Sequence, residues 1–183
     1  MHKRRDIHLQ PIKPAELVYE ALSLTHTEII TRGVTATGII DPELPAVLAD
    51  RVQIQHVLLN LVLNACESMS EKGTSERSLS INASAAGPHV LFSVRDSGVG
   101  IRTNLIEHLF DPFVTTKVEG LGLGLSIART VVETHGGKIW AENGDECGAI
   151  VSFLLPVVAT ASDGIHPPDA TYSTSSPVLT GVE

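Results

Sequence analysis

Residues 52–69 read VQIQHVLLNLVLNACESM and predict a mainly apolar helix that carries one narrow polar stripe. At about 100° per residue, five polar residues fall within an arc about 80° wide: Gln53, His56, Asn60, Asn64 and Glu67. An amphipathic helix whose polar face meets water gives a similar pattern. A solvated face is usually wider and rich in Lys and Glu, so the thin stripe with its two amides favours a helix that lines a cavity.

Two glycine-containing segments follow this helix. Residues 96–100 read DSGVG and close a predicted strand over 89–95, while residues 120–124 read GLGLG and lead into a predicted helix over 125–135. Taken singly, each also fits an ordinary turn or a surface loop. A carboxylate at a strand end can accept a hydrogen bond from the exocyclic amine of adenine, and the free amides of a helix start favour phosphate. Because an Asn oxygen suits Mg²⁺, the three segments in this order predict a site for a magnesium nucleotide.

These segments resemble the catalytic ATP-binding domain of bacterial sensor histidine kinases, part of a wider group that includes the gyrase, Hsp90 and MutL ATPase domains. The similar stretches are the N box at 56–69, the first glycine box at 96–101, the F box at 109–117, the second glycine box at 120–129, and residues 134–139. The resemblance covers roughly residues 12–156. The sequence FVTTK at 113–117 is similar to the corresponding motif of the nitrogen- and oxygen-regulated subgroup of these kinases.

The resemblance implies a role for each part of the pattern. Asn64 is the implied magnesium ligand and Asp96 the implied reader of adenine, and a lid over the phosphates is anchored to the body by Phe110 and Phe113. The residues that the resemblance puts around the ATP are Asn60, Asn64, Asp96, Gly98, Gly100, Ile101, Phe110, Thr115, Thr116, Lys117, Gly120, Leu121, Gly122, Leu123, Gly124 and Leu125.

Three of the polar residues are implied in catalysis: Asn60, Glu67 and Lys117. Hydrolytic relatives carry a glutamate at the position of Asn60, and an amide cannot accept a proton from water. The chain is therefore expected to donate the γ-phosphoryl group to a side chain rather than to water. Glu67 is a candidate base for an acceptor imidazole, although a surface glutamate near a helix end fits equally well.

None of the eight histidines has the context of the family's phosphoacceptor. The expected function is therefore that of the ATP-binding half of a two-component kinase, acting on a histidine of a separate dimerisation domain in cis or trans. The expected downstream partner is a response regulator. The isolated domain is expected to be a monomer and its parent a homodimer. The alternatives are a hydrolytic ATPase of the same group and a non-catalytic nucleotide-binding interaction module.

Composition agrees with these expectations. The net charge of −8 argues against nucleic-acid binding. No apolar run reaches the ~20 residues of a membrane span, so direct membrane insertion by this segment is not expected. The two cysteines form no metal-binding pattern and fit a reducing cytoplasm, although the parent protein can still be anchored in a membrane.

The order of predicted elements indicates an α+β fold, a two-layer α/β sandwich. A mixed, mostly antiparallel sheet of about five strands is expected to pack on three main helices, with a lid loop, as in the Bergerat-type fold that the resemblance implies. We expect a helix over 14–31 and strands over 34–40, 78–85, 89–95, 138–142 and 149–155. The expected domain is 14–158, after a polar lead-in at 1–13 from an upstream dimerisation region and before a disordered tail or linker at 159–183.

Overall fold

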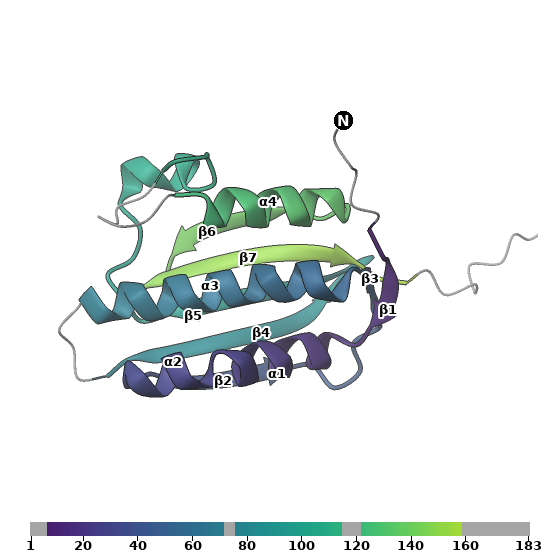
Figure 1. The fold of residues 1–183 in the computed structure, drawn as a ribbon, viewed down its shortest axis with the longest axis horizontal. Helices are drawn as coiled ribbons and strands as arrows, with labels where there is room; N and C mark the ends of the chain where they lie inside the picture. The colour runs from purple at the N-terminus through teal and green to yellow at the C-terminus, as the bar shows by residue number, and fades with distance from the viewer. Residues whose placement is uncertain (1–6, 72–75, 115–121, 159–183) are drawn as a thin grey trace, which may run out of the picture.

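The computed structural model describes residues 7–71, 76–114 and 122–158, which form a sheet with helices across one of its faces (Figure 1). The helices are α1 Pro14–Leu24, α2 His26–Thr31, α3 Arg51–Glu71 and α4 Gly124–Thr134, with a 3₁₀ helix, η1, at Thr103–His108. The strands are β1 Gln10–Ile12, β2 Thr35–Ile40, β3 Val47–Ala49, β4 Ser78–Ala86, β5 His89–Asp96, β6 Ile139–Asn143 and β7 Ala149–Pro156.

The main sheet has five strands in the order β2-β4-β5-β7-β6. Only the β2–β4 pair among them is parallel, and the other three pairs are antiparallel. The expected mixed, mostly antiparallel sheet on a helical layer is confirmed. In Figure 1, α3 runs across the middle of the sheet, with α1 on its β2 side and α4 on its β6 side.

The core lies between α3 and the sheet. Alternate residues of β5 point toward the helices and are buried, as the period of two in the sequence predicts. Phe92 of β5 and Phe153 of β7 are register partners, and their rings stack with centroids 5.0 Å apart. Both are fully buried, and each contributes roughly 1.5–3 kcal/mol by leaving water. This layer fixes the inner face of α3, so its polar stripe is directed toward α4 and the loops beyond the sheet.

The N-terminal region differs from expectation in two places. The helix predicted over 14–31 is interrupted at Thr25, whose buried hydroxyl donates a hydrogen bond to Ala21 O at 2.7 Å. Such a bond to the carbonyl four residues back slightly destabilises a helix, and α2 begins directly after Thr25, at His26. Within the stretch expected to be a polar lead-in, β1 pairs antiparallel with β3, and Ile12 is buried. Residues 1–6 and 159–183 lie outside the described part.

None of the helices within residues 7–71, 76–114 and 122–158 is both long enough and apolar enough to cross a membrane.

Candidate nucleotide-binding site

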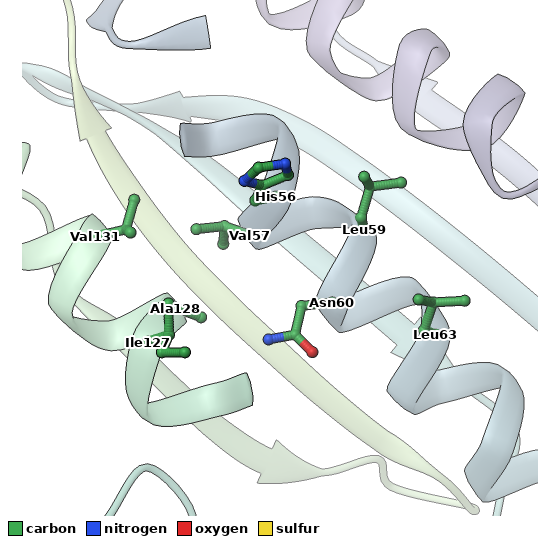
Figure 2. A pocket seen from close by; sticks show the side chains of 8 residues that line it. All are labelled: His56, Val57, Leu59, Asn60, Leu63, Ile127, Ala128 and Val131. Atoms are coloured by element: carbon green, nitrogen blue, oxygen red, sulfur yellow. The ribbon is translucent and has the colours of Figure 1, made fainter. Parts of the chain in front are cut away.

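The polar stripe of α3 is partly covered rather than open to bulk solvent. Asn60, Asn64 and Glu67 are half-buried, whereas His56, nearer the start of the helix, is exposed. In Figure 2, the Asn60 amide points into the space between α3 and α4. The middle of the stripe therefore faces other parts of the fold, as a helix that lines a cavity requires.

Gly124 brings the first turn of α4 directly against Asn60. A Cβ atom at Gly124 would lie 2.6 Å from Asn60 Oδ1 and 2.7 Å from Nδ2, so a larger residue here would displace the Asn60 amide. The first N–H groups of an α-helix have no carbonyl partner within the helix. Residues 124–126 therefore supply the kind of backbone donors that bind phosphate, next to the Asn60 amide.

The two ends of the predicted lid meet at a backbone hydrogen bond from Phe113 N–H to Gly122 O, with N and O 3.0 Å apart. Gly122 has a φ of +64°, and a Cβ there would lie 2.7 Å from the carbonyl carbon of Phe113. Phe113 itself has a φ of +67°. The segment between them contains five predicted site residues that lie outside the described residues: Thr115, Thr116, Lys117, Gly120 and Leu121.

The two phenylalanines of the F box behave differently. Phe110 is buried and belongs to the core, which agrees with an anchor for the lid. The expectation that Phe113 is a second anchor is wrong, because 76% of its surface is exposed. Its backbone, and not its ring, makes the connection to Gly122. Of the two other predicted residues near the start of α4, Leu123 accepts the Ile127 N–H bond and Leu125 packs against the core.

Asp96 closes the other end of the site. Its carboxylate is buried, and Oδ1 accepts hydrogen bonds from Gly98 N–H at 2.7 Å and from Ala149 N–H at 3.3 Å. A Cβ atom at Gly98 would lie 2.2 Å from the Ser68 hydroxyl of α3. The first glycine segment thus packs tightly onto the C-terminal half of α3, with a carboxylate held at the strand end.

The backbone at Ile101, five residues after Asp96, is held by a residue of β6 that lies 42 positions further along the chain. Asn143, the last residue of β6, accepts a hydrogen bond from Ile101 N–H at 2.6 Å and donates one to Ile101 O at 2.8 Å. Gly100 has a φ of +75°, and a Cβ there would lie 2.9 Å from Asn143 Oδ1. Ile101, another predicted site residue, is half-buried at this junction.

The site elements follow one another along α3. Gly98 packs at Ser68, Gly124 packs at Asn60, and Asn64 lies between them. At 1.5 Å per residue, the eight positions from Asn60 to Ser68 span about 12 Å. A nucleoside triphosphate can extend over that length with its base at one end and its phosphates at the other. Asn64 then lies at the level where its amide oxygen could hold a cation that accompanies the phosphates.

Two ionisable side chains near the C-terminal end of α3, Glu67 and Cys66, are shielded from solvent to different degrees. Glu67 is half-buried, and its charge helps to raise the pKa of Arg32, the C-cap residue of α2, after the larger effect of the hydrogen bond from Arg32 to Glu28. Cys66 is buried, and loss of solvation raises the pKa of its thiol to about 11. Cys66 is thus an inert core residue, and neither side chain is a free solvent-facing group.

A cavity of about 280 Å³ lies between α3 and α4 (Figure 2). Asn60 is the only predicted binding residue in its lining, which is otherwise mainly apolar: His56, Val57, Leu59, Leu63, Ile127, Ala128 and Val131. The cavity therefore adjoins the nucleotide site at Asn60 without containing Asp96 or Asn64. Leu63 and Ile127 are 39% and 57% exposed at its edges.

The oxygen donors on the polar stripe of α3 are of the type that binds magnesium together with substrate phosphates. No cluster of three or more His, Cys, Asp or Glu side chains with metal-binding geometry occurs in the described part of the chain. Mg²⁺ is commonly bound through one or two protein oxygens together with substrate phosphates and water. A single amide oxygen from Asn64, one helical turn beyond Asn60 on α3, fits that mode.

Sequence reasoning missed three contributors to the site. Ser68 contacts Gly98, and it could have been suspected because it lies one helical turn beyond Asn64. Asn143 and Ala149 hold the two ends of the Asp96–Ile101 loop, but the sequence indicates only that they flank a turn. Their role depends on the pairing of β6 with β7, which brings them next to a segment more than 40 positions away.

Comparison with known proteins supports the same assignment. Residues 49–159 match the family described as histidine kinase-, DNA gyrase B-, and HSP90-like ATPase. The chain is 39% identical over 157 residues to the sensor histidine kinase TmoS of Ectopseudomonas mendocina, covering 85% of this chain and 16% of TmoS. It is 41% identical over 142 residues to the sensor protein FixL of Bradyrhizobium diazoefficiens, covering 78% of this chain and 28% of FixL. The chain thus spans less than a third of either relative.

Solved structures with the same fold include histidine kinase catalytic domains. The nucleotide-free catalytic domain of the histidine kinase ThkA superposes with a TM-score of 0.72 at 36% identity, covering 82% of this chain and 96% of that domain. Full-length ShkA in complex with AMPPNP gives a TM-score of 0.74 at 25% identity, covering 86% of this chain and 33% of ShkA. The fold and the resemblance expected from sequence are confirmed. The chain belongs to the family of histidine kinase-, DNA gyrase B- and HSP90-like ATPases, and its fold is that of a histidine kinase catalytic domain.

Proposed function

We propose that this chain binds Mg-ATP and donates the γ-phosphoryl group to a histidine on a separate acceptor domain, in cis or in trans. The observation that carries the proposal is the order of groups along α3, with a buried carboxylate at one end, an amide in the middle and the free amides of α4 at the other. Family membership and the likeness to histidine kinase catalytic domains support it.

In this proposal Asp96 reads the base, and the glycines beside it let the purine approach the backbone. The Asn64 oxygen and the phosphates hold magnesium, which neutralises phosphate charge when it is bound. The first-turn amides of α4 and Lys117 of the lid orient the triphosphate. Phosphoryl transfer needs mainly positioning and charge stabilisation, so these groups account for most of the chemistry required.

Asn60 favours transfer to a side chain over hydrolysis. Its amide lies beside the first turn of α4, where the terminal phosphate would be, and an amide cannot deprotonate water. Of the two roles considered for Glu67, the order of groups along α3 favours that of a glutamate near the helix end over that of a base. Glu67 lies beside Ser68 at the base end, seven positions or about 10 Å from Asn60. We therefore expect Glu67→Gln to leave the rate of phosphoryl transfer nearly unchanged.

The acceptor domain would approach over the cavity between α3 and α4. This cavity has Asn60 in its wall, so it is continuous with the phosphate end of the site. Leu63 and Ile127 provide exposed apolar contacts for an amphipathic acceptor helix at its edges. The phosphohistidine product would then pass its phosphoryl group to an aspartate of a response regulator. A solved structure of the histidine kinase ThkA, 34% identical to this chain, in complex with a response regulator protein supports a response regulator as a partner.

We further propose that this domain works in the cytoplasm, as part of a homodimeric parent kinase. The curated sensor kinases that it resembles are between about three and six times longer than the matched segment, which leaves room for sensing and dimerisation regions.

Two measurements on the isolated chain test the proposal. Calorimetry with ADP, ATP and magnesium measures binding, and incubation with labelled ATP and a separately made acceptor domain of the parent measures transfer. We expect binding, labelling of the acceptor, and loss of labelling in Asn64→Asp without unfolding. A folded chain that takes up no nucleotide would refute the proposal. Rapid phosphate release without an acceptor would favour the hydrolytic ATPase, and binding without any transfer would favour a non-catalytic module.

A further inference from the structure

Residues 96–101 form the loop that we call the base-reading loop. The turn between β6 and β7 holds this loop at both of its ends. Asn143 and Ala149 are register partners at the ends of these strands. Ala149 N–H donates to Asp96 Oδ1, and the Asn143 amide exchanges two hydrogen bonds with Ile101. One pair of neighbouring residues in the sheet thus binds the first and the last residue of the 96–101 segment.

The same turn encloses the glycines within that segment. A Cβ atom at Gly100 would lie 2.9 Å from Asn143 Oδ1 and 3.2 Å from Gly148 O. Gly148, with a φ of +74°, packs so closely on Asp96 that a Cβ there would lie 1.8 Å from the Asp96 carbonyl oxygen. A hydrogen bond from Gly144 N–H to Gly148 O, 3.0 Å long, closes the turn.

The contacts of Asn143 differ from those of an ordinary turn asparagine. Asparagine in a turn usually bonds its own backbone one or two residues away. Here both the oxygen and the nitrogen of the amide are engaged by one residue 42 positions away. Because the loop contains two glycines, it has many backbone conformations available when it is not held.

We propose that Asn143 is a positioning residue for nucleotide binding, which holds the Gly100–Ile101 backbone so that the wall of the base pocket is formed before the nucleotide arrives. This inference rests on the proposed nucleotide site. Asn143 does not touch the reacting atoms, so its effect falls on affinity and not on the transfer step. Because the contact lies at the base end, the loss is the same for ADP and ATP.

The test compares the wild type with Asn143→Ala and Asn143→Ser, with Glu142→Ala as a control on the same strand. Calorimetry with magnesium and either ADP or ATP gives the affinity. Removing two hydrogen bonds of ordinary net strength corresponds to a nucleotide affinity about tenfold lower in Asn143→Ala than in the wild type. A serine hydroxyl can replace at most one of these bonds, so Asn143→Ser loses less, and Glu142→Ala binds like the wild type.

Amide hydrogen exchange separates positioning from a general loss of stability. We expect faster exchange at Ile101 in the nucleotide-free Asn143→Ala protein, with unchanged exchange in the centres of β5 and β7 and a melting temperature within about 2 °C of the wild type. With the acceptor domain saturating and ATP varied, the KM for ATP rises and kcat stays the same.

The outcomes distinguish this inference from the proposed function. A wild type that binds no nucleotide overturns both. A wild type that binds, with Asn143→Ala within twofold of it, overturns only the positioning role. A variant that loses affinity together with protection throughout the sheet also overturns it, since Asn143 would then be a general structural residue.

Discussion

His135 Nε2, at the C-terminal end of α4, accepts a hydrogen bond from the backbone N–H of Asp50, with the two nitrogens 3.0 Å apart. The other ring nitrogen, Nδ1, donates to Val131 O at 2.7 Å, so this arrangement requires the neutral imidazole. Asp50 in turn caps α3, since its carboxylate accepts hydrogen bonds from Gln53 N–H and His8 N–H. The end of α4 is thereby joined to the start of α3, which sets the spacing of the two helices that carry the site.

The Asp50 cap predicts a specific dependence of stability on pH. Burial alone would raise the pKa of the Asp50 carboxyl, but hydrogen bonds from the backbone N–H groups of Gln53, His8 and Val52 lower it overall. The unfolded value is about 3.9. The carboxylate therefore contributes stability above about pH 4, and this contribution is lost as the pH falls through the lower pKa of the folded state.

Asp50→Asn tests this dependence, because it keeps one acceptor oxygen and removes the charge. We expect urea unfolding at pH 7 to show a loss of about 1 kcal/mol relative to the wild type. At pH 3 the difference in unfolding free energy between Asp50→Asn and the wild type should be smaller. Asp145→Asn, which removes an exposed carboxylate from the β6–β7 turn, is the control and should change little at either pH. An Asp50→Asn deficit that is constant with pH would contradict the charge argument.

Asp96→Asn separates base reading from loop structure. The variant keeps an Oδ1 acceptor for Gly98 N–H and Ala149 N–H, so the fold and melting temperature should be nearly unchanged. It removes the charge that strengthens a hydrogen bond to an adenine amine. Such bonds are worth about 1.5–3 kcal/mol, so the dissociation constant for ADP should rise at least about tenfold in calorimetry. Unchanged affinity in the folded variant would exclude Asp96 as the reader.

Gly124→Ala tests the contact between α4 and Asn60. Alanine is favoured over glycine in helices by about 1 kcal/mol, so stability alone would rise if there were room. Because the new methyl group would lie within 2.7 Å of both amide atoms of Asn60, we expect the amide to be displaced and transfer to the acceptor to fall more than about tenfold.

A double-mutant cycle with Asn60→Ala provides the control for that result. If Gly124→Ala acts through the Asn60 amide, it should cause no further loss of transfer once the amide has been removed. Additive losses from the two substitutions would mean that Gly124 acts on the phosphates independently.

Leu63→Glu and Ile127→Glu test the cavity between α3 and α4 as the approach of the acceptor. Both side chains are exposed at its edges, so the fold should tolerate the change. We expect the KM for the acceptor domain to rise about tenfold while ADP affinity stays the same, because a charge would be buried against an apolar helix. Ile39→Glu, at a side chain of β2 that is 61% exposed, is the matched control. Equal effects at all three positions would argue against a local docking surface.

The two cysteines should react very differently with thiol reagents. Cys147 is exposed in the β6–β7 turn, whereas Cys66 is buried and the pKa of its thiol is raised to about 11, so little thiolate forms at pH 8. We expect a colorimetric thiol assay on the native protein to titrate one group quickly and the second only in denaturant. Cys147→Ser should abolish the fast phase. A fast phase that survives this substitution would show that the core around Cys66 opens readily.

Local patterns were sufficient for most of the secondary structure. The alternation of residues 78–95 predicts the β4–β5 hairpin, and the apolar period of residues 52–69 predicts α3, because each pattern repeats within a single element. The glycine segments also indicated the position of the site, since their backbone requirements are local. The interruption of the first helix at Thr25 was not predicted, because the spacing of apolar residues carries no information about the side-chain hydrogen bond of Thr25.

The amino-acid sequence by itself determined the family, the five strands of the main sheet and the helices α3 and α4, and it predicts which residues meet a magnesium nucleotide. Tertiary structure alone decided that β1 joins β3, that Phe113 faces solvent, and that Asn143 holds Ile101. These contacts join residues that are far apart in the chain or depend on what covers a side chain. Residue periodicity reports which face of an element is apolar, but the neighbour of that face is set by how the layers pack.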